Sequence, residues 1–112
     1  MDNLNAQRRE WGLLSSHGQV LALISRQPAI TVRRLSDVLN FSERRIMGVL
    51  RDLQDAGMIE RERQGRQNIY QVNLDAFTRS TISPTATLRN FLAAVDALPA
   101  EDGRHREEAR QA

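Results

Sequence analysis

One continuous stretch, residues 31–72, carries most of the structural information in this chain, and it reads TVRRLSDVLNFSERRIMGVLRDLQDAGMIERERQGRQNIYQV. Apolar residues first repeat at helical spacing in two blocks, 32–39 and 43–56. The period of the pattern then changes to two in 58–63 and 67–72. This change of period predicts two short helices followed by a β-hairpin.

The ends of the two helices are marked by residues that suit helix caps. Thr31 and Ser42 each precede a helix, and their side chains can accept a hydrogen bond from its first turn. Asn40 and Gly57 each follow a helix, and both tolerate the left-handed conformation that ends one. A turn of about three to four residues therefore joins the helices, which is the helix-turn-helix pattern.

The two strands are expected to join in a tight hairpin. Gln64-Gly65 lies between them, and glycine supplies the positive φ that such a turn needs. Because side chains alternate along a strand, Tyr70 and Val72 share one face and should pack against the helices.

Weaker patterns flank this motif on both sides. Residues 17–27 form an amphipathic helix, with Ser16 as its cap and Pro28 as its stop. Near the other end, another amphipathic helix follows a Ser/Thr-rich segment. We therefore divide the chain into an N-terminal helical extension at 1–15, a central domain at 16–77, a linker at 78–86, a C-terminal helix at 87–98 and a disordered tail at 99–112.

The composition fits one small domain, and its high isoelectric point has a simple cause. The chain has 112 residues, of which 40% are apolar, and a formal net charge of +2. All 16 basic residues are arginine, so few groups titrate between histidine and arginine. A small excess of arginine therefore raises the isoelectric point to 10.3. The positions of the arginines are more informative, and eight of the 16 lie within residues 33–66.

Several classes of function lack the residues they need. The absence of cysteine excludes disulfides, thiolate metal sites, thiol catalysis and iron–sulfur clusters. His17 and His105 lie far apart, and no Ser/His/Asp set, glycine-rich phosphate loop or HExxH motif is present. We therefore expect no enzyme activity, no cofactor and no metal site. The polar N-terminus and the lack of a long apolar run predict a cytoplasmic protein without a membrane span.

The helix expected at 43–56 has two chemically different sides. Its apolar residues gather on one stripe, while the opposite side holds Arg44, Gly48 and Arg51, with Arg45 on one flank. A recognition helix presents its N-terminal residues to base edges in the major groove, where arginine can bond guanine. The pattern favours such a helix, and the alternative is a solvated face whose arginines pair with residues four positions along.

Gly48 needs an explanation, because glycine in the middle of a helix costs about 1 kcal/mol relative to alanine. Close approach of DNA is one candidate. Close packing against the helix at 32–39 is the other, and the sequence leaves both open.

The hairpin supplies a second basic site. Arg63 lies on the first strand, Arg66 lies just beyond the turn, and Asn68 is one of the amides around it. A protruding tip of this composition can reach a phosphate or the minor groove, where narrow A·T tracts attract arginine. The alternative is a solubilising edge whose charges block sheet extension.

The run LSDVLNFSERRIMGVLRDLQDAGMIERERQGRQNIYQV resembles the winged helix-turn-helix of MarR- and ArsR-type transcriptional regulators of bacteria and archaea. The resemblance rests on an L-x-x-x-L helix, a Ser-led second helix and the segment LQDAGMIER that leads into the wing, and it covers residues 16–77. It implies a mostly α fold with a small β-hairpin wing, and DNA binding by a homodimer. An extra N-terminal helix and a C-terminal dimerisation helix would complete the chain.

The resemblance also assigns roles to individual positions. Metal-sensing members use cysteine or histidine clusters that this chain lacks, so a metal sensor is not expected. Recognition-helix contacts match Ser42, Arg44, Arg45 and Gly48, the wing tip matches Arg66, and the start of the preceding helix, which meets the DNA backbone, matches Thr31 and Arg33. With the residues chosen by pattern, the DNA-binding candidates are Thr31, Arg33, Ser42, Arg44, Arg45, Gly48, Arg51, Arg63, Arg66 and Asn68.

The helix at 87–98 is surplus to a winged domain that can bury its own core. Its apolar stripe then needs a partner, and an exposed stripe of this length usually marks an interface. We expect it to pair with its symmetry mate in a homodimer, and the alternative is that it folds back on its own domain. The stripe consists of Leu88, Phe91, Leu92, Val95 and Leu98.

Two functions from different classes follow. The first is a sequence-specific, double-stranded-DNA-binding transcriptional regulator that acts as a homodimer and represses by occupying a promoter. The second is a winged-helix module for protein–protein assembly, whose arginines only solvate its surface. A small-molecule effector could bind between the dimerisation helices, but no residue identifies one.

Overall fold

A computed structural model describes residues 12–97 of the chain. Its helices and strands confirm the predicted class, which is mostly helical with one β-hairpin. In chain order they are α2 (Ser16–Arg26), α3 (Val32–Leu39), α4 (Glu43–Asp55), β1 (Ile59–Gln64), β2 (Gln67–Val72) and α5 (Leu88–Ala94).

The core lies where the helices meet the base of the hairpin. Helices α2, α3 and α4 pack against one another, and β1 and β2 close the other side of the cluster. Each helix contributes an apolar stripe, as its spacing predicts. The stripe of α4 consists of Ile46, Val49, Leu50 and Leu53, and all four side chains are buried.

The predicted caps around the helix-turn-helix are confirmed. The hydroxyls of Thr31 and Ser42 each accept a hydrogen bond from the backbone amide three residues on, at 3.0 and 3.1 Å. Asn40 ends α3 with φ +60° and Gly57 follows α4 with φ +75°, so both occupy the left-handed region. Asn40 thus turns the chain from α3 toward α4, and Gly57 turns it from α4 toward the hairpin.

The start of α2 differs from the prediction by one residue. Ser15, not Ser16, is the cap, and its hydroxyl accepts a hydrogen bond from the Gly18 amide at 3.1 Å. Two consecutive serines offer the same chemistry, so the sequence alone does not choose between them. The helical extension expected at 1–15 lies mostly outside the described residues, and residues 12–15 are not helical.

The hairpin turn also moves by one residue. Gln64 pairs with Gln67 in the antiparallel register, so the two-residue loop is Gly65-Arg66 and not Gln64-Gly65. Gly65 has φ +62° while Arg66 keeps a negative φ, which is the pattern of a type II′ turn with glycine first. Arg66 therefore lies at the tip of the hairpin.

Strand β2 joins the hairpin to the helices. Tyr70 is buried and Val72 is half-buried, which confirms the face predicted for them. The Tyr70 amide donates a hydrogen bond to the carbonyl oxygen of Pro28 at 2.9 Å, beyond the C-terminal end of α2. This bond and the buried ring hold the base of the hairpin in place.

Helix α5 is shorter than predicted and ends at Ala94, four residues before Leu98. Asp96 takes the left-handed conformation with φ +57°, and the amide of Ala97 donates to the carbonyl of Leu92 at 2.7 Å. The Asp96 amide donates to Ala93, which completes a Schellman motif. The helix therefore ends before residue 98, the last residue of the predicted range.

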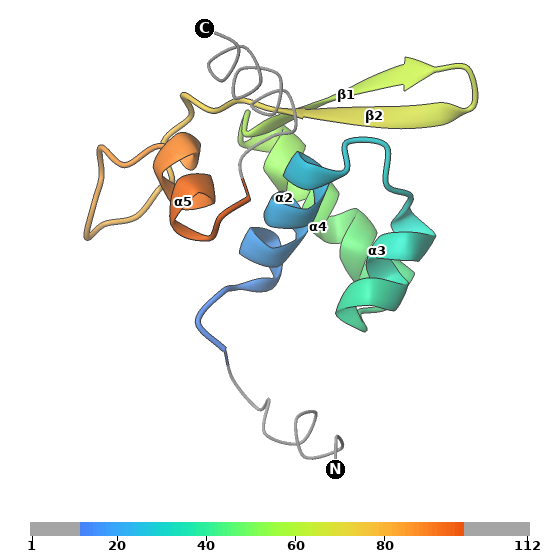
Figure 1. The fold of residues 1–112 in the computed structure, drawn as a ribbon, viewed down its shortest axis with the longest axis horizontal. Helices are drawn as coiled ribbons and strands as arrows, with labels where there is room; N and C mark the ends of the chain where they lie inside the picture. Colours follow the sequence, from blue (N-terminus) through green and yellow to red (C-terminus); the bar gives the residue numbers. More distant parts are fainter. Residues whose placement is uncertain (1–11, 98–112) are drawn as a thin grey trace, which may run out of the picture.

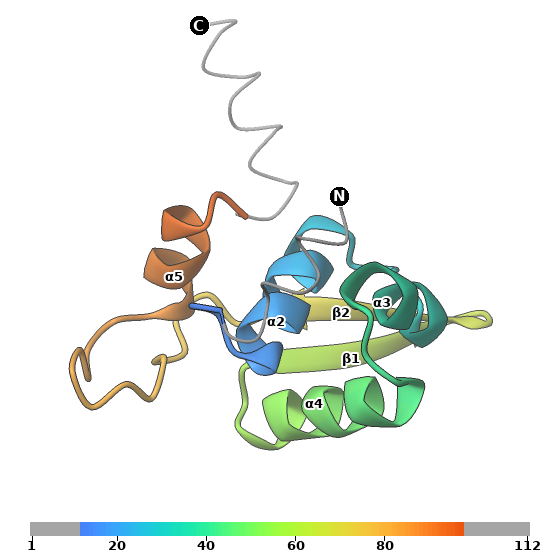
Figure 2. The same cartoon turned by 90° about the horizontal axis from the view of Figure 1, so that it is seen from below.

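The hairpin and helix α5 lie toward opposite ends of the molecule. In Figure 1 the hairpin extends to the right beyond α3, whereas α5 and the loop before it lie on the left of α2. Figure 2, turned by 90°, shows the same separation, with α4 running beneath the hairpin.

Within the described residues, no helix is both long and apolar enough to span a bilayer.

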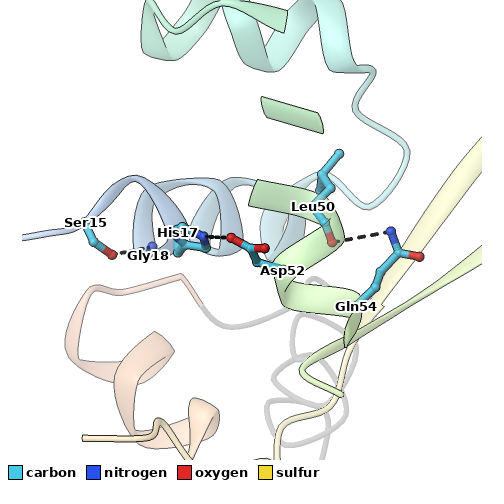
Figure 3. A network of polar contacts seen from close by, with 6 residues as sticks. All are labelled: Ser15, His17, Gly18, Leu50, Asp52 and Gln54. Carbon is cyan, nitrogen blue, oxygen red and sulfur yellow. Dashed lines mark hydrogen bonds and ion pairs between the residues drawn. The ribbon is translucent and has the colours of Figure 1, made fainter. Parts of the chain in front are cut away.

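One polar contact ties α2 to α4 on the surface. Figure 3 shows His17 on α2 pointing toward Asp52 on α4, with Nε2 and Oδ2 2.8 Å apart. Both side chains are substantially exposed, so the contact adds little to stability and mainly sets how the two helices meet.

Candidate nucleic-acid interface

The outward side of α4 is a basic face next to an open backbone. Arg44 and Arg51 are exposed, and they lie seven residues apart, which is about two helical turns on the same side. Glu43 is the acidic residue in the first turn, where a carboxylate also favours the helix dipole. The buried stripe faces the core, so these two arginines point away from it.

Gly48 lies between those arginines, and the structure removes one of its two explanations. A Cβ atom built at Gly48 would meet nothing within 4 Å among the described residues. Close packing against α3 therefore does not require glycine here. Close approach of a group from outside the described residues is the explanation that remains.

The arginines of the α4 face do not form the intrahelical pairs that a merely solvated face would show. Asp55 lies four residues after Arg51, but no ion pair joins them. The ion pairs found in residues 12–97 are His17–Asp52 and Arg89–Asp75, both away from this face. The guanidinium groups of Arg44 and Arg51 are thus available to a partner within this part of the chain.

Arg45 behaves differently from its neighbours. Its guanidinium carbon lies 3.9 Å from the centroid of the Phe41 ring, within the range of a cation–π contact. Phe41 belongs to the turn before α4, so the contact fastens the turn to the first turn of the helix. Arg45 remains exposed, and its position on the flank suits a phosphate better than a base edge.

Of the remaining candidates near the turn, Thr31 and Ser42 use their side chains to cap helices. The hydroxyls of Thr31 and Ser42 are already engaged as helix caps. Both residues are exposed, and so is Arg33 in the first turn of α3. The structure thus places these three where a DNA backbone could pass, without showing such a contact.

At the hairpin tip, one predicted arginine is held and another is not. Arg63 Nε donates a hydrogen bond to the carbonyl oxygen of Gly65 at 3.1 Å, which stabilises the turn. Arg66 is exposed within the loop itself, and no ion pair involves it in the part of the chain that the structure describes. The tip therefore carries one arginine held against the turn and one exposed arginine within the loop.

The register places Arg61 on the same face of the hairpin as Arg63. Arg61 pairs with Tyr70, and Arg63 pairs with Asn68, so these four share the hairpin face that meets the helices. A groove between α4 and this face is lined by Arg51, Arg61 and Asn68 among others. The alternation of Arg61 and Arg63 in the sequence already indicates that they share a face.

Two groups in this groove have unusual surroundings. The Asn68 side-chain oxygen is buried and has no hydrogen-bond partner among the described residues. Burial raises the pKa of the Tyr70 phenol above its ordinary value, and the nearby Arg61 charge partly opposes that rise. The groove therefore combines an unsatisfied acceptor, a neutral phenol and two cations.

The structure gives the predicted dimerisation stripe a partner within its own chain. Leu88 is 2% exposed and Leu92 is 0% exposed, and both belong to the main core. Phe91 and Val95 are half-buried, and the Phe91 ring lies so close to α2 that a Cβ at Gly18 would be 3.2 Å from it. Leu98 lies outside the described residues. Leu88 and Leu92 thus pack as the fold-back alternative expects, and a role of the stripe in a dimer stays a prediction.

No cluster that could hold a metal ion was found in the described part of the chain, counting groups of three or more His, Cys, Asp or Glu side chains.

One known protein resembles part of this chain in sequence, and another resembles nearly all of it in fold. The riboflavin kinase of Thermococcus kodakarensis is 39% identical over 49 residues, which is 44% of this chain and 23% of that enzyme. The chain thus corresponds to less than a quarter of that relative. The crystal structure of MepR, a transcription regulator of the Staphylococcus aureus multidrug efflux pump MepA, matches with a TM-score of 0.50 and 13% identity, covering 99% of this chain and 74% of MepR. At that identity the likeness shows the shared fold.

A model of the MarR family matches residues 11–67, which is more than half of the chain and includes α2, α3, α4 and the hairpin up to its turn. This agrees with the winged-helix architecture. The chain therefore belongs to the MarR family and has a winged-helix fold.

Proposed function

We propose that this chain is a sequence-specific, double-stranded-DNA-binding regulator that represses transcription as a homodimer. The observation that carries the proposal is the outward face of α4, where Arg44 and Arg51 lie on either side of Gly48. No contact among the described residues requires glycine at that position. An arginine fork can donate two hydrogen bonds to guanine, and a bare backbone lets base edges come close.

The hairpin and the start of α3 would supply the contacts that fix orientation. Arg66 at the tip and Arg63 beside it can meet phosphates or enter the minor groove next to the major groove that holds α4. Thr31 and Arg33 would lie along the phosphate backbone. Few contacts per protomer then argue for two protomers on two half-sites.

The homodimer needs a surface other than the buried leucines of α5. The segment before that helix exposes Phe77 and Ile82, at 58% and 91%. Hydrogen bonding between Thr78 and Ala86 closes this segment into a loop at the end opposite the hairpin tip. Two apolar side chains on one loop support the proposal that this end meets a second copy.

Light scattering after size exclusion tests the dimer. A monomer has a mass of 12.7 kDa, and we expect the wild type at twice that value. Ile82→Glu should shift it toward the monomer without unfolding it, since this side chain is almost fully exposed. A wild type that is monomeric at all accessible concentrations would contradict the dimer.

Selection of bound sequences from a random duplex pool tests the DNA-binding proposal directly. We expect a motif with two-fold symmetry and a steep fall of affinity with salt. Arg66→Ala should reduce the slope of log affinity against log salt by about one unit per protomer, and Arg44→Ala should relax the preference at one base pair. Arg89→Ala is the matched control, because it removes the same charge from α5, far from the hairpin tip.

The role in repression is tested with the selected site placed inside a promoter. Transcription in vitro should fall as the protein occupies the site, and should recover when the site is scrambled. If no duplex binds at low salt, the DNA-binding proposal fails, and the assembly module with solvating arginines becomes the better account of the basic face.

A further inference from the structure

Met47 is an apolar side chain in an unexpected place. It is 49% exposed, and of the large apolar residues of α4 it is the one that the core does not bury. It lies next to Gly48 and is three residues after Arg44 and four before Arg51. A helix of 3.6 residues per turn therefore brings all four to neighbouring positions on the surface.

Met47 lies where the basic face of α4 meets the edge of the core, because Leu50 and Tyr70 line the same groove as the arginines. With Arg51 it lines the groove between α4 and the hairpin. The Gly48 position beside it is open, with nothing within 4 Å of a Cβ built there. An apolar side chain is thus set among cations on the face that points away from the core, where a partner rather than the protein itself would cover it.

The chemistry of the major groove offers one apolar group. Every base edge there presents hydrogen-bond donors and acceptors, and the 5-methyl group of thymine is the exception. Methionine is flexible and polarisable, so it can follow a methyl group whose position varies slightly between sites. An arginine within one turn on either side can bond a guanine in an adjacent base pair.

Resting on the proposed function above, we propose that Met47 is a specificity-determining residue that contacts the 5-methyl group of a thymine, beside a guanine read by Arg44 or Arg51. Gly48 lets the helix backbone approach the base pair closely enough for this short-range contact. The preferred half-site then contains a thymine whose methyl group, and not only its hydrogen-bonding edge, is recognised.

The experiment uses the duplex recovered by selection and replaces each thymine in turn with 2′-deoxyuridine. This change removes the methyl group and leaves every hydrogen-bonding atom in place. Burial of one methyl group corresponds to roughly a fourfold change in affinity. We expect one thymine per half-site to show a loss of about that size with the wild type.

The same substitution is then measured with Met47→Ala, Met47→Leu and Val38→Ala. Met47→Ala should bind the thymine and uracil duplexes equally, and Met47→Leu should restore the difference. Val38→Ala is the matched control, because Val38 is 47% exposed on α3 and the thymine preference should survive its loss. Thermal melting of each variant confirms that it folds.

The outcomes separate this inference from the proposal on which it rests. A motif without a conserved thymine, or a uracil penalty that persists in Met47→Ala, overturns the role of Met47 and leaves DNA binding intact. The absence of binding to any duplex overturns the proposed function, and the role of Met47 with it.

Discussion

At the scale of single residues, the backbone conformation requires glycine at two positions and does not require it at Gly48. Gly57 and Gly65 have positive φ, so the backbone itself requires glycine there. Gly48 is helical and open, so the fold does not require it. Its lower helix propensity is a cost that the free protein bears and that contact with a partner can offset.

Gly48→Ala should therefore separate stability from binding. We expect the free protein to gain up to about 1 kcal/mol in unfolding free energy, because alanine is the better helix former and the added methyl meets nothing. Affinity for the selected duplex should fall. Thermal or urea unfolding and a binding titration on the same sample measure the two effects. A variant that binds DNA as well as the wild type would show that Gly48 has no role at the interface.

Residue-level features that depend on local chemistry were predictable from the sequence. The caps at Thr31 and Ser42 and the left-handed ends at Asn40 and Gly57 need only a hydroxyl or a permissive residue at the right spacing. The end of α5 was not predictable in this way. Asp96 has a positive φ within a Schellman motif whose apolar pair, Leu92 and Ala97, is buried in the fold, and that burial depends on tertiary packing.

The candidate site shows the same division. Alternation and helical spacing identified Arg44, Arg51 and Arg66 as outward-facing, and the structure exposes all three. The contacts that restrict Arg45 and Arg63 involve Phe41 and a backbone carbonyl, and their geometry depends on the folded turn. Their roles in DNA binding stay predictions.

At the scale of elements, the hairpin turn gives a test with an opposite sign. Gly65→Ala also adds a methyl group that meets no atom within 4 Å, but at φ +62°. An L residue there costs about 1–2 kcal/mol. We expect lower stability and weaker DNA binding through a less ordered tip, measured by the same unfolding and binding assays. Gly48→Ala is the control for adding a methyl group without this strain, and equal stability changes in the two variants would contradict the argument.

Helix α5 is the element whose role the structure changes most. Leu92 is fully buried in the core of its own chain. Leu92→Ala should lower the unfolding free energy by about 2–5 kcal/mol, which is the usual cost of truncating a buried leucine. If the helix served only as a dimer interface, the loss would vanish on dilution to monomer. Urea unfolding at several protein concentrations distinguishes these cases.

At the scale of the whole molecule, the stability should depend on pH because the single tyrosine of the chain is buried. The chain has one tyrosine, no cysteine and no lysine, so Tyr70 is the side chain that titrates between histidine and arginine. Burial raises the pKa of Tyr70 in the folded state. The folded protein therefore holds this proton more tightly than the unfolded chain, and the associated stability is lost as pH rises through the folded pKa.

We expect the unfolding free energy to fall above pH 10.0, the ordinary value for the phenol, and the fall to be absent or shallower in Tyr70→Phe. The absorbance of the phenolate should reach its midpoint above that pH in the folded protein. Arg61→Ala should move the midpoint higher still, because the cation opposes the rise. A midpoint at or below the ordinary value would show that the ring is not buried as described.

The hydrogen bond between the Tyr70 amide and the Pro28 carbonyl has a consequence for measuring motion. This amide points away from β1 and exchanges with solvent only when the base of the hairpin separates from the end of α2. Its deuterium uptake therefore reports the opening of the wing at a single backbone position. Protection that increases on adding DNA would show that the wing is clamped in the complex, and its rate would give the free energy of that clamping.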